Sequence, residues 1–107
     1  MRFGDAKRRV VYCLDRGAFD SEYRDAMAEN NLLATGQITV ADVKRLIGRC
    51  RGPQYSAKPM TEDSTTMKHE FKPVVDGEQW FIRFYFIERP SDFAMFISVH
   101  KSRFRRP

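Results

Sequence analysis

The sequence predicts an α+β domain in which N-terminal helices pack on one face of a small antiparallel β-sheet. Two observations predict this class. Before about residue 52 the apolar residues recur at helical spacing, and after it they alternate as they do in strands. The chain has 107 residues, 42% of them hydrophobic, and shows no internal repeat or dividing linker. We therefore expect one domain over residues 1–107.

Two helices are predicted in the first third of the chain. Residues 6–15 read as a short helix that ends before Gly17, because glycine commonly follows the last helical turn. A second helix is expected after Asp20, which can cap its N-terminus. Its apolar stripe would consist of Tyr23, Ala26 and Met27.

A third helix is predicted to begin after Thr39. Asp42 follows three residues later, which is the spacing of a capping box. The apolar face of this helix would be made of Val40, Val43, Leu46 and Ile47. Residues 51–66 contain two prolines and are predicted to form a long connection, a kind of segment that often carries function.

Three strands are predicted in the second half, at residues 67–74, 80–87 and 93–100. Asp76 and Gly77 mark the first turn, and residues 88–92 form the second. Short turns between consecutive strands predict an antiparallel meander.

Strand alternation suggests how side chains divide between the two sheet faces. If the helices cover the face of Trp80, Ile82 and Phe84, then Arg83 and Tyr85 lie on the opposite face. Strict alternation in the last strand puts Ala94, Phe96, Ser98 and His100 together. We expect His100 to share the uncovered face with Arg83 and Tyr85.

The charge of the chain favours an anionic partner, either nucleic acid or an acidic protein. Lysine and arginine number 19 against 14 acidic residues, for a formal net charge of +5. The tail, with Lys101 and Arg103, adds cations beside the last strand. No apolar run approaches the roughly 20 residues that span a bilayer, and we recognise no signal peptide, so no membrane partner and a cytoplasmic location are expected.

The two cysteines predict neither a disulfide nor a metal. Cys13 and Cys50 occupy apolar positions of helical patterns, which is typical of buried free thiols. The alternative is a zinc site that adds His69 and His100, but no short ligand spacing supports it. No metal or other cofactor is predicted.

Several nucleotide-binding and metalloprotease motifs are absent, which narrows the classes of reaction that the protein can catalyse. The sequence has no Gly-x-Gly-x-x-Gly, Walker loop or His-Glu-x-x-His. Cations with interleaved aromatic residues on an uncovered sheet suit RNA, whose phosphates they bind and whose bases they stack on. Lysine, histidine and arginine together also permit metal-free RNA cleavage by general acid–base catalysis.

The segment 39–102 resembles the MqsR family of bacterial toxins. The matching features are Tyr55, Lys58 with Met60, Phe71-Lys72-Pro73, Gly77, Phe81-Ile82-Arg83 and Ser98-Val99-His100. The resemblance implies a RelE-like fold and an endoribonuclease of a type II toxin–antitoxin system. It also implies mRNA as substrate and a cognate antitoxin as partner, and it leaves association with the ribosome open.

The resemblance assigns roles position by position. Lys58 matches a lysine linked to catalysis, and Arg83 and His100 each stand where the family has a lysine. Lys68 or its neighbour His69 falls at a position that is polar in the family. Phe81 replaces a tyrosine, a role that Tyr85 would take over. The expected catalytic residues are Lys58, His69, Arg83 and His100, and the expected substrate-binding residues are Tyr55, Lys68, Tyr85, Lys101 and Arg103.

Other interpretations remain open. Lys58 can be a solvated loop lysine, His69 a packed core residue, and Arg83 a residue whose head simply reaches solvent. The protein would then be a non-catalytic RNA- or protein-binding module, such as a phage-type inhibitor or an inactive toxin homologue. The missing hydroxyl at Phe81 favours this alternative. A second alternative is a protein-binding domain whose basic tail docks on an acidic partner.

Overall fold

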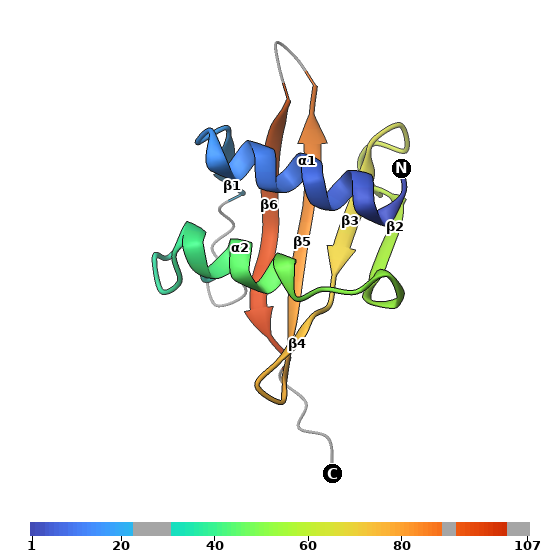
Figure 1. The fold of residues 1–107 in the computed structure, drawn as a ribbon. Helices are drawn as coiled ribbons and strands as arrows, with labels where there is room; N and C mark the ends of the chain where they lie inside the picture. The colour runs from blue at the N-terminus through green and yellow to red at the C-terminus, as the bar shows by residue number, and fades with distance from the viewer. Residues whose placement is uncertain (23–30, 89–91, 103–107) are drawn as a thin grey trace.

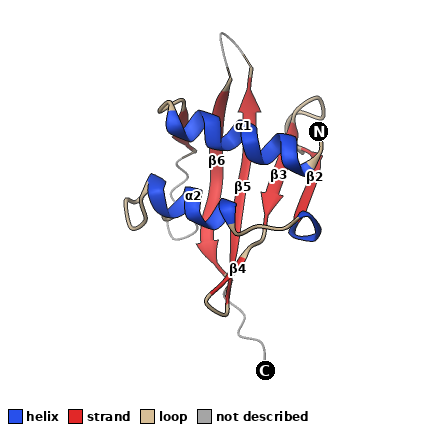
Figure 2. Ribbon diagram, viewed as in Figure 1, coloured by secondary structure: helices blue, strands red, loops and turns tan. Residues whose placement is uncertain are grey.

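The structure is a computed structural model that describes residues 1–22, 31–88 and 92–102 (Figure 1). Its elements, in chain order, are α1 (Phe3–Asp15), β1 (Phe19–Ser21), α2 (Val40–Gly48), a 3-10 turn (Gly52–Gln54), β2 (Tyr55–Pro59), β3 (Met67–Phe71), β4 (Val74–Val75), β5 (Glu78–Ile87) and β6 (Phe93–Lys101). Both α-helices cross the same face of a six-stranded sheet (Figure 2). This confirms the predicted α+β class with helices on one face.

The two helices follow their local sequence signals. The helix α1 ends as predicted, with Gly17 in the left-handed region at φ 68°. The helix α2 has the predicted capping box, in which the Asp42 N–H donates to the Thr39 hydroxyl and the Thr39 N–H donates to the Asp42 carboxylate. No helix among the described residues is long and apolar enough to cross a membrane.

The sheet is mixed, so the prediction of a purely antiparallel sheet was wrong. The predicted meander exists as β3, β5 and β6, which pair antiparallel. However, β1 pairs parallel with β6, and Asp20 lies within β1 instead of capping a helix. The other residues of the expected second helix, from Tyr23 to Met27, lie outside the described residues.

The segment 51–66 is not one long connection, which corrects a second prediction. Its residues Tyr55–Pro59 form β2, an edge strand that pairs antiparallel with β3. Four of the five residues of β2 are exposed, so the strand lacks the apolar alternation that would have revealed it. The strand order across the sheet is β1-β6-β5-β3-β2, with β4 paired to β5.

A bulge in β6 reverses the predicted alternation of that strand. Arg83 pairs with Ser98 but Phe84 pairs with Phe96, so Ile97 has no partner on β5. As a result Phe96 lies on the helix-covered face with Phe84, while Ser98 stays on the opposite face. Ala94 follows Phe96 to the covered face, contrary to the prediction.

The core lies between the helices and the covered face of the sheet. The helices contribute Ala6, Val10, Cys13, Leu14, Val43, Leu46 and Ile47, and the strands contribute Phe71, Val75, Ile82, Phe84, Ala94, Phe96 and Val99. Rings of Phe71, Phe84 and Phe96 meet at centroid distances of 5.4 and 5.6 Å, within the usual range for aromatic pairs. This packing fixes the sheet and so fixes which side chains point away from the helices.

Candidate functional site

The face of the sheet opposite the helices, here called the outer face, gathers most of the predicted site residues. Directly paired residues of neighbouring strands share a face. The pairs Lys58 with Lys68, Glu70 with Arg83, Arg83 with Ser98, and Phe81 with His100 therefore extend across four strands of the outer face. Tyr85 follows Arg83 on the same face of β5. No helix among the described residues covers this face (Figure 1).

Lys58 and Lys68 place two like charges opposite each other. Such a pair repels across the strands. Within the described ranges, neither lysine forms an ion pair. Lys58 is exposed and Lys68 is partly exposed, so both can reach a bound anion. A phosphate between them would remove the repulsion.

Arg83 is held in place by its neighbours. Its Nε donates to the Glu70 carboxylate, and its guanidinium lies 5.2 Å from the ring centre of Phe81. Both Nη groups lack a partner among the described residues. Arg83 therefore presents an oriented pair of donors, although Glu70 offsets its charge.

His100 is positioned to exchange a proton through one ring nitrogen. Its Nδ1 lies 2.8 Å from the carbonyl oxygen of Lys101, which can only accept, so Nδ1 carries a proton. Nε2 is then the ring nitrogen that remains for contact with a substrate. The ring lies beside Phe81, with 5.4 Å between centroids. Histidine is the side chain best suited to proton transfer near neutral pH.

Tyr85 also has a fixed orientation. Its hydroxyl donates to the carboxylate of Glu22 over 2.7 Å, which joins β5 to the residue that follows β1. The phenol ring is partly buried. Tyr85 thus borders the outer face as an anchored ring.

His69 and Tyr55 lie on the helix-covered face, away from the other predicted residues. His69 is only 3% exposed, and its Nδ1 lies 2.8 Å from the Tyr55 hydroxyl. Burial, together with the positive charges of the N-terminal amine and Arg9, lowers the pKa of His69 to about 4. The structure does not bring His69 beside Arg83 or His100, because the sheet separates them.

The two basic residues predicted in the tail do not join the outer face. Lys101 pairs with Trp80 on the helix-covered side, lies 5.5 Å from its ring centre and binds Glu78 at 2.7 Å. Arg103 lies outside the described residues.

The cysteines are buried free thiols, and burial raises the pKa of both. His100 lies on the other side of the sheet from them, so the four-residue zinc site considered above does not form. In the part of the chain that the structure describes, no three potential metal ligands cluster.

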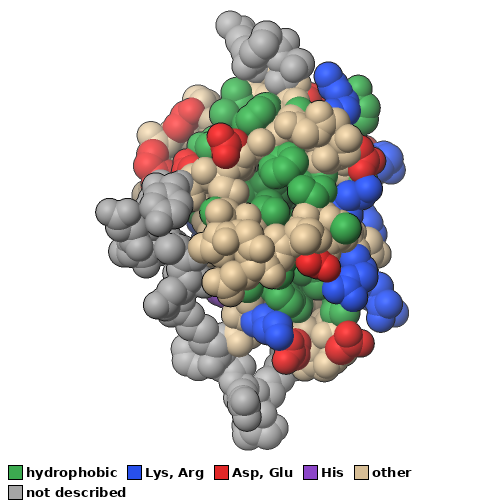
Figure 3. All heavy atoms as spheres, turned by 90° about the vertical axis from the view of Figure 1, so that its left-hand side faces the viewer, with side chains coloured by type: hydrophobic (Ala, Val, Ile, Leu, Met, Phe, Trp, Pro, Cys, Tyr) green, Lys and Arg blue, Asp and Glu red, His purple; other side chains and the backbone are tan. Residues whose placement is uncertain are grey.

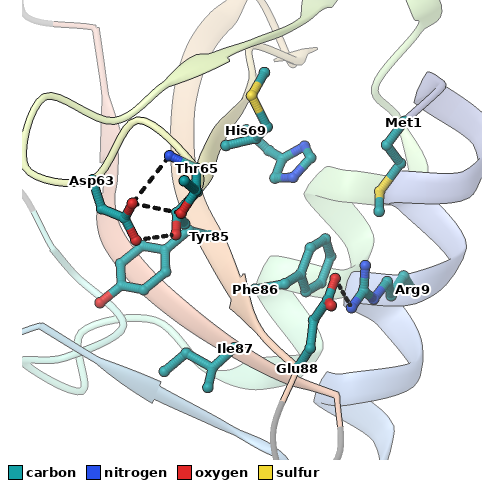
Figure 4. Close-up of a pocket in the computed structure, with 11 residues that line it drawn as sticks. Met1, Arg9, Asp63, Thr65, His69, Tyr85, Phe86, Ile87 and Glu88 are labelled. Carbon is teal, nitrogen blue, oxygen red and sulfur yellow. Dashed lines mark hydrogen bonds and ion pairs between the residues drawn. The ribbon is translucent and has the colours of Figure 1, made fainter.

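No sequence pattern predicts a pocket at one end of the sheet, beside the start of β3 and the end of β5. This pocket, of about 700 Å³, lies between the start of β3, the end of β5, the residues around Thr65 and the helix α1 (Figure 4). It contains His69 and Arg9. No local pattern reveals it, because Arg9 and Glu88 meet there across 79 residues of chain.

A different surface is seen from the side of the molecule. Hydrophobic side chains gather in the middle of this view, with lysines and arginines along its right-hand edge (Figure 3). A pocket of about 570 Å³ lies between β1 and the start of α2, lined by the apolar residues Phe19, Leu33, Ala34, Ile38 and Val40 with the polar residues Asp20, Ser21 and Thr39. Among the described residues that line it there is no cation to bind a phosphate.

We compared the chain with known proteins. No protein-family model matches it, and neither the curated proteins nor the solved structures contain a match.

Proposed function

We propose that the protein is a metal-independent endoribonuclease whose outer face binds and cleaves single-stranded or translated mRNA. The observation that carries the proposal is the cross-strand placement of Lys58, Lys68, Arg83 and His100 on one sheet face, next to the ring of Phe81. Cations and stacking rings on one surface are what RNA binding requires.

Each of these side chains has its own role in the cleavage reaction. The ribose 2′-OH loses a proton and attacks the adjacent phosphorus, the bond to the 5′-oxygen breaks, and a 2′,3′-cyclic phosphate forms. The Nη groups of Arg83 stabilise the charge on the phosphoryl oxygens. His100, protonated on Nε2, gives its proton to the leaving 5′-oxygen. Lys58, as a cation, positions the 2′-OH, whose proton passes to a water molecule, and Lys68 binds a neighbouring phosphate.

The biological setting of the proposal comes from the resemblance to the MqsR family. A RelE-like fold, a role as a toxin, a cognate antitoxin as partner and action in the cytoplasm all belong to this proposal. The resemblance includes Tyr55 and His69, but both lie on the helix-covered face, so no part in cleavage on the outer face is proposed for them.

A second candidate is RNA binding without cleavage. Two observations favour it: Phe81 has no hydroxyl where the family has a tyrosine, and Glu70 pairs with the arginine that would stabilise the transition state. Binding would survive both features, because Lys58 and Lys68 remain unpaired among the described residues.

The test is cleavage of a long single-stranded RNA in excess EDTA. The native chain is compared with His100→Ala, Arg83→Ala and the control Arg49→Ala, which removes an exposed cation next to α2. We expect the first two variants to lose about a hundredfold or more in rate, the usual contribution of an acid or an oxyanion donor, and the control to retain activity. Equal rates in all four proteins would contradict the site. Binding without cleavage by the native chain would select the second candidate.

A further inference from the structure

The pocket lined by His69, Arg9 and Phe86 is a notch at one end of the sheet, where β3 and β5 separate. Their pairing runs from Phe71 with Ile82 to His69 with Phe84, while β5 continues to Ile87. The end of β5 therefore borders an open space beside the start of β3. Its volume of about 700 Å³ falls within the roughly 300–1,000 Å³ of small-molecule sites.

His69 forms part of the wall of this notch, and its Nε2 makes no hydrogen bond to a described residue. Its ring stacks on Phe84 at 5.3 Å and on Tyr55 at 6.0 Å, and its Nδ1 bonds the Tyr55 hydroxyl. Although the residue is 97% buried, Nε2 has no partner among the described residues. Figure 4 shows the ring pointing from β3 into the space between Phe86 and Met1.

The other walls combine apolar and aromatic side chains with the polar side chains of Asp63, Thr65 and Thr66. Phe86 lies on the helix-covered face of β5 and Tyr85 on the outer face, so the notch connects the two faces (Figure 4). The guanidinium of Arg9 packs over the Phe86 ring at 4.3 Å. Its charge is balanced by Glu88 and Asp92, while its buried Nε has no acceptor among the described residues.

These features suit an uncharged planar ring and do not suit a phosphate. Burial keeps His69 neutral near pH 7, because its pKa lies at about 4. A neutral imidazole offers one hydrogen bond, as donor or acceptor according to its tautomer, and no net charge. Aromatic rings beside hydrogen-bonding groups are what an unpaired nucleobase needs.

We propose that the notch receives one unpaired nucleobase of an RNA strand bound on the outer face, stacked on Phe86 or Tyr85 and hydrogen-bonded to His69 Nε2. This proposal rests on the RNA-binding function proposed above. The path from the outer face to the notch is short. Lys68 lies between the pocket residues Met67 and His69, and it pairs with Lys58 on the outer face. A phosphate held by the two lysines is therefore next to the mouth of the notch.

The test uses a single-stranded 2′-O-methyl RNA of about eight nucleotides, which cannot be cleaved through its 2′-oxygen. The same probe is made with one abasic residue at each internal position in turn. Fluorescence anisotropy gives Kd for the native chain, for Tyr55→Phe, and for the double variant Tyr55→Phe/His69→Phe. The double variant removes both hydrogen-bonding partners together, so it leaves no buried polar group unpaired.

We expect one abasic position to weaken binding by the native chain and by Tyr55→Phe about tenfold. In the double variant this position should cost much less than in the native chain. Met67→Trp, at a rim position that is 41% exposed, should fill the notch and also abolish the abasic penalty. This variant keeps the test decisive if the double variant does not fold.

The outcomes separate this proposal from the one on which it rests. One contrary result is that the native chain binds RNA equally well with every abasic probe. Another is that the loss of affinity at one abasic position remains in both Met67→Trp and the folded double variant. Either result overturns the nucleobase site and leaves RNA binding in place. If the native chain does not bind RNA, both proposals are overturned.

Discussion

At the scale of single residues, the buried His69 and the partly buried Tyr55 form a polar pair between the sheet and α1. Phe3 of α1 packs against the Tyr55 ring, and Phe84 packs against the imidazole. Burial disfavours the protonated imidazole, so the pKa of His69 in the folded protein, about 4, lies well below the ordinary value of about 6.5.

This shift predicts a pH dependence of stability. The unfolded chain binds the proton more readily, so the contribution of His69 is complete above about pH 6.5 and is lost as the pH falls toward about 4. The complete loss amounts to roughly 3 kcal/mol, of which about 2 kcal/mol falls between about pH 7 and about pH 5. Urea unfolding at pH values of about 7 and about 5 measures it. The double variant Tyr55→Phe/His69→Phe should be less sensitive to this change, and equal sensitivity would contradict the assignment.

Glu70 gives a second prediction at this scale, because it offsets the charge of Arg83 on the outer face. The variant Glu70→Gln keeps the size of the side chain and removes the negative charge. Affinity for single-stranded RNA should rise by up to about fivefold, the equivalent of about 1 kcal/mol. The matched control is Glu78→Gln, whose carboxylate binds Lys101 on the other side of the sheet. A rise in the control equal to that in Glu70→Gln would show a non-specific charge effect.

At the scale of elements, α2 depends on the capping box at its start. The Thr39 hydroxyl accepts from the Asp42 N–H and the Asp42 carboxylate accepts from the Thr39 N–H. Thr39→Ala should lower the free energy of unfolding by about 1 kcal/mol, as measured by urea unfolding. The control Thr61→Ala changes an exposed threonine without a side-chain hydrogen bond among the described residues and should leave stability unchanged. Equal stability of both variants would contradict the role of the cap.

The elements also show which parts of the fold are predictable from the sequence. The end of α1 before Gly17 and the start of α2 after Thr39 were predicted, because their signals involve residues one turn apart. The strands β1 and β2 were not, because one has three residues and the other is an exposed edge strand. The bulge at Ile97 was missed because it depends on pairing with β5.

The candidate site shows the same difference between features set by local sequence and features set by distant contacts. Alternation along β5 placed Arg83 and Tyr85 on one face correctly, and the outer-face position of His100 was also correct. The bulge at Ile97 changes the face of the residues before it, Phe96 and Ala94. His100 comes after the bulge, so its predicted face stays correct. The notch around His69 and Arg9 could not be predicted, since it joins the first helix to the end of β5 through contacts distant in sequence.

At the scale of the whole molecule, the two sides of the sheet differ in what they offer a partner. The helix side has exposed cations such as Arg8 and Arg49, but α1 and α2 separate it from the aromatic rows of the sheet. The outer face combines Lys58, Lys68 and Arg83 with Phe81. Net charge alone does not distinguish these sides, so the choice between them rests on this arrangement.

The most direct measurement of this claim is RNA affinity as a function of salt for two matched double variants. Lys58→Ala/Lys68→Ala removes two outer-face charges, and Arg8→Ala/Arg49→Ala removes two exposed charges from the helix side. For single strands each lost phosphate contact lowers the slope of log K against log salt by about 0.7. We predict that the outer-face variant binds more weakly and loses about 1.4 from this slope, while the helix-side variant matches the native chain. Equal losses in both variants, or a larger loss in the helix-side variant, would contradict the assignment of the outer face as the RNA-binding surface.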